Sequence, residues 1–228
     1  AQHRVRVGVL RDGSRYEIRA CDTDGKNWRT LWRFENAEDG AWPMGFGRDP
    51  QELFVRANHE GRDAVWSVRL DDPALKKRLR LADKHHDIQS GLLSLPTTGE
   101  VLGLTTHRED THRTSDPDAN LWNPAWREVA RAIDKQLPQS YNRIVEQSND
   151  GQRFIVLSSS RHRPDRYYIG NGADGQLMLL GDTFPDLAGA ALATKRSVKV
   201  KSRDGLVLTS YLTLPVGREL GDKGAPLP

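Results

Sequence analysis

The chain has 228 residues, with 34 Lys and Arg against 31 Asp and Glu, seven His and one Cys. No run reaches the ~18 apolar residues that a membrane-spanning helix needs, and one cysteine excludes an internal disulfide framework or a cysteine-based zinc site. The basic residues are spread along the chain rather than clustered, so the sequence predicts no nucleic-acid partner and no membrane partner.

Neither end of the chain carries a recognisable start or stop signal. It begins at Ala1 without a Met or a signal peptide, and it ends at Pro228 in a proline-rich run. We therefore expect a piece of a longer protein. The compartment stays open, because a single Cys suits the cytoplasm and a removed signal peptide would suit the periplasm.

The opening segment predicts a meander of three antiparallel strands. Apolar and polar residues alternate over 4–9 and again over 15–20, and a third run covers 28–34. Asp12-Gly13 and Asp24-Gly25 separate these runs. Because Gly accepts the positive φ of a tight turn, Asp-Gly between alternating runs is a strong hairpin signal.

The same unit recurs along the chain. A turn, an apolar strand, a polar loop, an aromatic strand and a hairpin strand follow each other over 52–81 and over 150–180, and a weaker copy starts at Gly99. A short run precedes each of these three copies, at 42–47, 88–95 and 141–146, and would form the innermost strand; the first copy has none. The equivalent strands begin about 50 residues apart, a period typical of four-stranded repeats.

These repeats predict an all-β fold, a partial β-propeller of about four blades of four-stranded antiparallel sheet. A single such sheet cannot bury both faces, and face-to-face packing around an axis solves this. A β-sandwich is the structural alternative, but a sandwich has no reason to repeat at this period.

Two segments interrupt the repeats. A polar loop at 108–120 precedes Asn123-Pro124, a helix start, and apolar residues at helical spacing predict a helix over 124–136 that Pro138 ends. Residues 185–194 predict a short Ala-rich helix, followed by two alternating strands at 197–201 and 206–214.

Motifs for catalysis and for cofactors are missing from the sequence. It contains no Gly-x-Ser-x-Gly elbow, no Walker A loop, no dinucleotide fingerprint and no His-Glu-x-x-His. Ser158-Ser159-Ser160 follows an apolar strand without a neighbouring base, so we interpret it as a strand end. The sequence therefore predicts no catalytic residue and no cofactor in this chain.

Three sets of residues remain as candidates for binding. His107 and His112, with two carboxylates between them, could hold a divalent metal, but their spacing is neither strand-like nor helical and a loop of this composition is more often simply solvated, so the sequence predicts no metal site. Arg161 and Arg163 could recognise an anion or a carboxylate, although polar loops at the rim of a propeller are usually just solvated. The six Trp residues could form a binding platform, but their recurrence at repeat positions favours a role in the core.

The segment 197–215, reading SVKVKSRDGLVLTSYLTLP, resembles the junction between the propeller and the α/β-hydrolase domain in the prolyl oligopeptidase family of serine peptidases. The runs 148–156 and 164–168 resemble the last propeller repeat of its acylaminoacyl-peptidase and dipeptidyl-aminopeptidase branches. The paired glutamates with which dipeptidyl peptidases hold a substrate amino terminus have no clear match here, so the resemblance does not extend to dipeptidyl activity.

The resemblance implies a division of the chain into two parts. Residues 1–183 would be a partial propeller, with blades at about 1–36, 41–82, 87–137 and 140–182. Residues 184–228 would be a linker helix and the first strands of a truncated hydrolase domain.

The resemblance also implies a function. The chain would be the non-catalytic propeller portion of a serine peptidase, gating peptide access to an active site in the hydrolase domain, whose Ser, Asp and His would lie beyond residue 228. The expected partners are peptide substrates and that hydrolase domain, together with self-association through uncovered sheet faces. The alternative is a stand-alone binding module without enzymatic activity.

Overall fold

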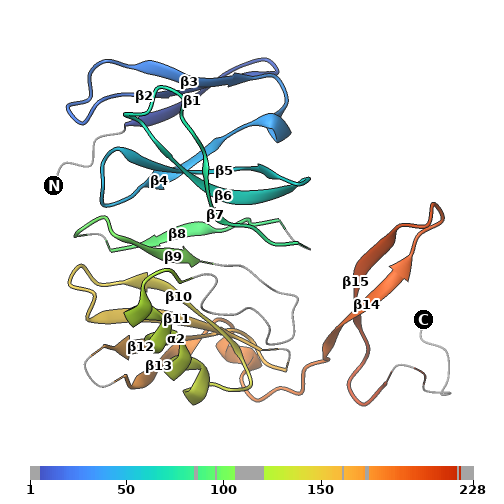
Figure 1. Ribbon diagram of the computed structural model, residues 1–228. Helices are drawn as coiled ribbons and strands as arrows, with labels where there is room; N and C mark the ends of the chain where they lie inside the picture. The colour runs from blue at the N-terminus through green and yellow to red at the C-terminus, as the bar shows by residue number, and fades with distance from the viewer. Residues whose placement is uncertain are drawn as a thin grey trace. The chain divides into compact units, whose positions relative to one another are not determined.

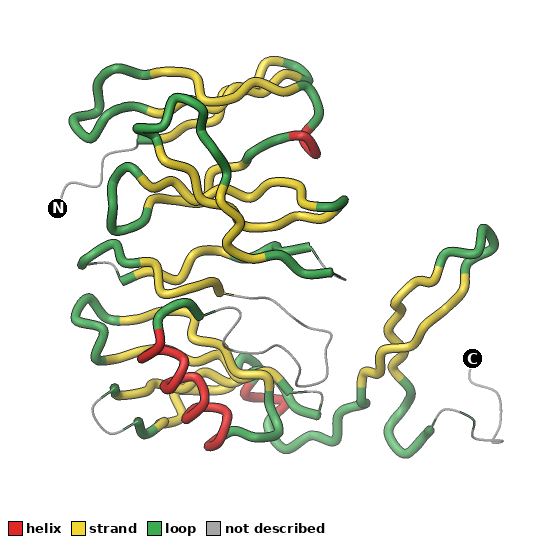
Figure 2. Tube along the Cα trace, in the orientation of Figure 1, coloured by secondary structure: helices red, strands yellow, loops and turns green. Residues whose placement is uncertain are grey.

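The computed structural model describes residues 6–84, 87–95, 97–105, 121–160, 162–172, 175–219 and 221. They form two compact units, which we describe separately. Unit 1 comprises residues 1–107, 115–128 and 148–151, and unit 2 comprises residues 108–114, 129–147 and 152–228. Strands dominate both units (Figure 2). Among the described residues, no helix is long and apolar enough to cross a membrane.

Unit 1 contains three antiparallel sheets, in the orders β1-β2-β3, β4-β5-β6-β7 and β8-β9 (Figure 1). Their strands are β1 (Val7–Asp12), β2 (Arg15–Ala20), β3 (Arg29–Phe34), β4 (Trp42–Phe46), β5 (Glu52–His59), β6 (Arg62–Arg69), β7 (Arg78–Leu81), β8 (Gly91–Ser94) and β9 (Val101–Thr105). A one-turn 3-10 helix, η1 (Ala37–Asp39), joins the first sheet to the second.

Unit 2 contains a four-stranded sheet in the order β10-β11-β12-β13 and a separate hairpin, β14-β15. Their strands are β10 (Tyr141–Gln147), β11 (Arg153–Ser159), β12 (Arg166–Asn171), β13 (Leu177–Asp182), β14 (Lys195–Lys201) and β15 (Val207–Thr213). A helix, α2 (Pro124–Gln136), precedes this sheet in the chain, and a 3-10 turn, η2 (Pro185–Leu187), follows it.

The strand registers repeat from sheet to sheet. The pairs β1–β2, β5–β6 and β11–β12 run without a register shift. Each outer strand, in contrast, carries one extra residue against its neighbour: Leu31 in β3, Arg80 in β7 and Leu180 in β13. The inner pairs β4–β5, β8–β9 and β10–β11 are also shifted. A β-bulge bends its strand and re-aims the side chains around it, so the repeated unit includes these bends.

The sheets of unit 1 pack face to face through two apolar clusters. The first joins Ala20 of β2 and Leu31 and Trp32 of β3 to Leu53 and Val55 of β5. The second joins Phe54 and Val65 of the middle sheet to Leu92 of β8 and Leu104 of β9. Successive side chains of β5 therefore serve opposite faces of the middle sheet, which is why residues 53–55 are all buried.

One aromatic ring lies tightly against the backbone in the sheet of unit 2. Phe154 on β11 is 2% exposed, and a Cβ on Gly170 of β12 would lie 2.2 Å from the ring. Only glycine fits at position 170, because the backbone of β12 approaches the ring directly. At the outer edge, Met178, Leu179 and Leu180 of β13 are exposed in succession.

The helix and the strands agree with the sequence interpretation, except at one linker. The all-β class with one helical insertion is confirmed, and α2 begins at Pro124 as predicted. The first sheet has three strands and the third has two within the described residues. The helix predicted for 185–194 is wrong beyond Leu187: only η2 forms, and Gly189 adopts a positive φ of 83°. A segment this short, without a buried apolar face, cannot offset the cost of helix nucleation.

Candidate functional site

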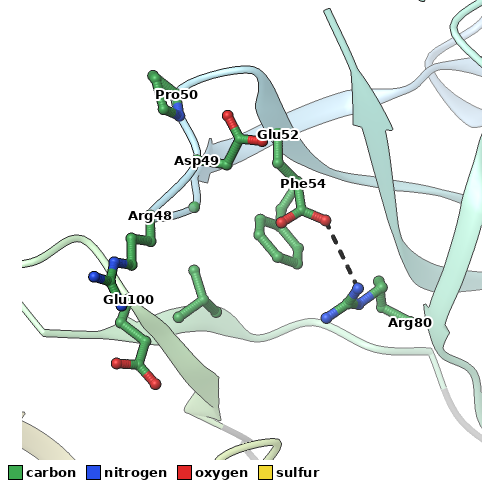
Figure 3. Close-up of a pocket in the computed structure, with 9 residues that line it drawn as sticks. Arg48, Asp49, Pro50, Glu52, Phe54, Arg80 and Glu100 are labelled. Atoms are coloured by element: carbon green, nitrogen blue, oxygen red, sulfur yellow. Dashed lines mark ion pairs between the residues drawn. The ribbon is translucent and has the colours of Figure 1, made fainter.

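A pocket lies at one end of the sheets of unit 1. We call it the rim pocket; it has a volume of about 630 Å³ and is lined by Gly47, Arg48, Asp49, Pro50, Glu52, Phe54, Arg80, Glu100 and Val101 (Figure 3). The β4–β5 turn forms one wall, and the start of β9 and the end of β7 form the others. A cavity of this size is within the range that holds small ligands.

The β4–β5 turn is held in place by its own polar groups. The Gly47 N–H donates to the Glu52 carbonyl at 3.0 Å, and the Glu52 N–H donates to the Asp49 carbonyl at 3.0 Å. The Gln51 N–H donates to Asp49 Oδ1 at 2.9 Å. This Asx turn explains why Asp49-Pro50 separates two strands in the sequence.

Arg69 on β6 fixes the turn from outside the pocket. Its Nη1 lies 2.8 Å from Asp49 Oδ2, and its Nη2 lies 2.6 Å from Asp71 Oδ2. The Gln51 backbone hydrogen bond, followed by that from Arg69, lowers the pKa of Asp49 below its usual value. The hydrogen bond from Arg69 lowers the pKa of Asp71 in the same way. Both carboxylate oxygens of Asp49 thus bind groups of the chain itself, the Arg69 guanidinium and the Gln51 N–H.

Arg80 is placed over the aromatic floor of the rim pocket. It is the extra residue of β7, and its guanidinium lies 5.5 Å from the ring centre of Phe54 and 5.0 Å from that of Trp122. These two rings are stacked at 5.5 Å and 18°. Arg80 Nη1 faces Glu52 Oε1 at 3.7 Å (Figure 3), a longer contact than a charge-assisted hydrogen bond. The two rings and the Glu52 carboxylate therefore both contact this arginine.

Glu100 links the pocket to the start of α2. The Asn123 side-chain amide donates to Glu100 Oε1 at 2.8 Å. Asn123 Oδ1 accepts from the Ala125 and Trp126 N–H groups at 3.0 and 3.3 Å, which is an N-cap. The remaining charged group of the pocket is Arg48, which is exposed and has no polar partner among the described residues.

The rim pocket is suited to binding rather than to covalent chemistry. None of its nine lining residues is a Ser, Thr, Cys or His. Its charges are mixed, with two arginines and three carboxylates over an apolar floor. Across the part of the chain that the structure describes, no group of three or more His, Cys, Asp or Glu could hold a metal ion.

The candidates drawn from the sequence lie elsewhere. His107, His112 and Arg161 fall outside the described residues. Arg163 donates to the Ser158 and Pro164 carbonyls at 3.3 and 3.0 Å, and to the Ser140 and Ser158 hydroxyls at 2.9 and 3.1 Å. These neutral acceptors belong to the chain itself, so Arg163 joins the start of β10 to the end of β11. Its binding of a substrate carboxylate stays a prediction.

Neither described histidine has its imidazole hydrogen-bonded to a serine, although the His162 backbone N–H donates to Ser160 Oγ at 3.3 Å. His59 packs edge-on against Trp66 with ring centres 5.3 Å apart, and His162 Nδ1 lies 3.2 Å from Thr194 Oγ1. Ser158 is fully buried and hydrogen-bonded to Arg163, as a structural strand end would be.

Sequence reasoning missed the rim pocket. Its residues come from the β4–β5 turn, from β5 and β7 and from the start of β9, and Trp122, which contacts Arg80, lies further along the chain; no short motif connects them. The signals that were present are the Gly47-Arg48-Asp49-Pro50 turn and an arginine at an extra position of an outer strand. The extra position of that arginine is visible only in the strand register.

A curated relative matches most of the chain. Dipeptidyl aminopeptidase BIII of Pseudoxanthomonas mexicana is 28% identical over 190 residues, which cover 82% of this chain and 26% of the relative. The chain thus spans about a quarter of the length of that protein. No family model matches the chain.

A solved structure shares the fold. A puromycin-hydrolyzing peptidase of Mycobacterium tuberculosis gives a TM-score of 0.51 at 15% identity, over 89% of this chain and 30% of that one. TolB of Acinetobacter baumannii gives 0.44 at 13% identity, over 92% of this chain and 51% of that one. The sequence match and the fold of the first structure bear out the resemblance found in the sequence.

Proposed function

We propose that this chain, a propeller portion of the prolyl oligopeptidase family, restricts which peptides reach the active site of a serine peptidase. The observation that carries the proposal is the match to a dipeptidyl aminopeptidase, of which this chain covers 26%. Peptide-bond hydrolysis by a serine enzyme needs a nucleophile, its activating His, an orienting acid and an oxyanion hole. In the proposal these groups belong to a hydrolase domain in the remainder of the polypeptide.

The packing of unit 1 supports a selective role. Its sheets meet through fully buried residues such as Leu53, Val55 and Val65, each 0% exposed. Such interfaces are close-packed and do not open without losing core contacts. A stiff stack of sheets admits a short, flexible peptide more readily than a folded protein.

The β14–β15 hairpin supports a link to a further domain. Its seven-residue register is regular, yet Leu206, Val207 and Leu208 are exposed at 60%, 61% and 43%. An isolated two-stranded hairpin is marginally stable by itself. In the proposal, a hydrolase domain covers these side chains.

The first test compares hydrolysis by this chain and by the full-length polypeptide. We expect the full-length polypeptide to cleave chromogenic amides of N-acylated amino acids or short peptides, and to lose this activity to a serine-reactive phosphonate. The 228-residue chain alone should release no chromophore above the buffer rate. If this chain alone hydrolyses the substrate and Ser159→Ala abolishes that activity, the proposal has placed catalysis in the wrong domain.

The second test addresses selection. The full-length polypeptide should cleave short peptides and leave folded protein substrates intact, whereas its hydrolase domain without the propeller should lose this preference. Equal selection with and without the propeller would contradict the gating role. If the full-length polypeptide cleaves no ester or peptide at all, the stand-alone binding module is the better description.

A further inference from the structure

One cation and one anion in the rim pocket face no opposite charge. Three of the five charged side chains that line it are already paired, with each other or with Arg69: Asp49, Glu52 and Arg80. The remaining two are Arg48 and Glu100. Among the described residues neither of them forms an ion pair, and the partner of Glu100 Oε1 is the neutral amide of Asn123. The rim pocket therefore offers a ligand one charge of each sign.

These two side chains stand on neighbouring turns that approach each other closely. Arg48 belongs to the turn between β4 and β5, and Glu100 ends the turn between β8 and β9. A Cβ on Gly99 would lie 3.7 Å from the Gly47 carbonyl oxygen and 3.9 Å from the Arg48 Cα, so little more than a methyl group would fit between the turns. Figure 3 shows Arg48 and Glu100 on the same side of the rim pocket, away from Arg80.

The turn that carries Glu100 is held by its own hydrogen bonds, as the β4–β5 turn is. The Leu95 N–H donates to the Glu100 carbonyl at 2.9 Å, and the Gly99 N–H donates to the Leu95 carbonyl at 2.8 Å. The Glu100 N–H donates to Thr98 Oγ1 at 3.2 Å. Because both turns are ordered before any ligand arrives, binding does not have to offset the entropy of ordering their backbones.

A free α-amino acid matches this pattern of charges. Its ammonium and its carboxylate are bonded to the same carbon atom, so they need two opposite charges that stand close together. The Arg48 guanidinium suits a carboxylate, which it can bind through two parallel hydrogen bonds. A simple anion would be repelled by Glu100, and a simple cation by Arg48. Direct pairing of Arg48 with Glu100 is no strong competitor, because exposed ion pairs contribute little.

The uncharged lining favours an aliphatic side chain on that amino acid. Its side chains are those of Pro50, Phe54 and Val101, and none of them carries a hydrogen-bonding group. Phe54 is 2% exposed, so the accessible apolar contacts come from exposed Pro50 and half-buried Val101. A polar side chain would lose water here without gaining a partner. The volume of about 630 Å³ leaves room for an aliphatic group.

We propose that the rim pocket binds a free aliphatic α-amino acid, such as leucine. Arg48 binds its carboxylate, Glu100 binds its ammonium, and its side chain lies against Pro50 and Val101. Binding is reversible and involves no covalent step. A site that needs both charges at once distinguishes a free amino acid from a residue inside a peptide chain, which carries neither charge.

Isothermal titration calorimetry on the 228-residue chain tests the proposal with leucine and three relatives of it. We expect saturable binding of leucine. Leucinamide lacks the carboxylate and N-acetyl-leucine lacks the ammonium, so each should bind about tenfold more weakly, the effect of losing a hydrogen bond to a charged group. Leucyl-leucine keeps both charges but separates them by a peptide unit, and it should also bind more weakly than leucine.

Two variants assign each charge of the ligand to its residue. Arg48→Gln should weaken the binding of leucine about tenfold but should not weaken that of leucinamide, which has no carboxylate. Glu100→Gln keeps an oxygen for the Asn123 amide; it should weaken the binding of leucine but not that of N-acetyl-leucine. Arg78→Gln, which removes an exposed charge outside the rim pocket, should change none of these affinities.

Three results would overturn the proposal. The first is the absence of saturable leucine binding. The second is binding of leucinamide, N-acetyl-leucine or leucyl-leucine that is as tight as that of leucine. The third is an Arg48→Gln variant that weakens every ligand equally, because the residue would then act through the fold and not through the carboxylate. Since the titration follows binding by this chain alone, its outcome is independent of the proposed gating role.

Discussion

The backbone of Gly170 lies so close to the ring of Phe154 that the sheet of unit 2 has no room for one methyl group. A Cβ at Gly170 would lie 2.2–2.9 Å from three ring atoms. The ring is 2% exposed and cannot swing out to solvent. The absence of a side chain at residue 170 thus lets the Phe154 ring lie against the backbone of β12.

We expect Gly170→Ala to destabilise unit 2 by about 1–3 kcal/mol through overpacking. The matched control is Gly181→Ala on the neighbouring strand, where a Cβ would meet nothing within 4 Å. Unfolding in urea, with hydrogen exchange at the amides of β11 as the probe, measures the free energy of unfolding of both variants. Adding Phe154→Leu should recover part of the loss; no recovery would place the strain elsewhere.

A second residue-scale prediction concerns pH. The pKa values of Asp49 and Asp71 are lowered in the folded chain, with Arg69 a cause in both. Stability from a lowered carboxyl pKa is present above the unfolded value, ~3.9 for Asp, and is lost as pH falls through the folded value. Arg69→Gln should therefore raise both pKa values and flatten the loss of stability below about pH 4.

Carbon-13 titration of the two carboxyl groups measures this effect directly. Arg78→Gln is the control, because it removes an equal charge from an exposed residue outside the rim pocket. The shifts in Arg69→Gln should shrink as salt is added, since these groups are exposed to solvent and screened. Unchanged Asp49 and Asp71 titrations in Arg69→Gln would show that this ion pair does not persist in solution.

At the scale of elements, α2 depends on one cap. Asn123 accepts from two N–H groups of the first turn and donates to Glu100. Asn123→Ala should cost about 1–2 kcal/mol, because capping and the link to β9 are lost together. Asn123→Asp keeps the cap but places a second carboxylate against Glu100. Its stability should therefore lie between that of the unaltered chain and that of Asn123→Ala. Exchange at the Ala125 and Trp126 amides measures the order of the three proteins.

Local signals explain which elements the sequence predicts. Asn123-Pro124 is visible in the sequence and its geometry is settled within one turn, so the start of α2 follows from it. The bulge at Arg80 depends instead on pairing with β6, and the stack of Phe54 on Trp122 joins segments far apart in the chain. No local pattern encodes such contacts, and the rim pocket is therefore absent from the sequence interpretation.

Arg163 is a second residue whose contacts with distant parts of the chain cannot be found from a local sequence pattern. Its arginine-rich loop has the composition of an anion site, yet one acceptor of its guanidinium is Ser140, 23 residues away in the chain. The helix prediction for residues 185–194 failed for a related reason: the Ala-rich composition favours a helix, but none of these residues is buried, so no apolar face stabilises one.

At the scale of the whole molecule, exposed apolar strands predict self-association of this chain. Met178 and Leu180 on β13 are 65% and 60% exposed, next to the exposed Leu179. We expect light scattering to show a mass that rises with concentration. Met178→Lys with Leu180→Lys should lower it, whereas Ala191→Lys, at an exposed position outside the strands, should lower it less. A monomer at every concentration would contradict this expectation.

The extra residues of the outer strands also determine which genetic changes the fold tolerates. Without Arg80, Leu79 and Leu81 would become neighbours, and they already oppose neighbouring residues of β6, Trp66 and Val65. An in-frame loss of three nucleotides at codon 80 would thus leave every other side chain of β7 on its present face, while removing the cation above the aromatic floor. Deletion of codon 79 would instead bring Arg80 opposite Trp66, so that a charged side chain replaces Leu79 at that position. Among the described outer strands, codons 31, 80 and 180 are therefore places where this gene can shorten while the flanking residues keep their pairing.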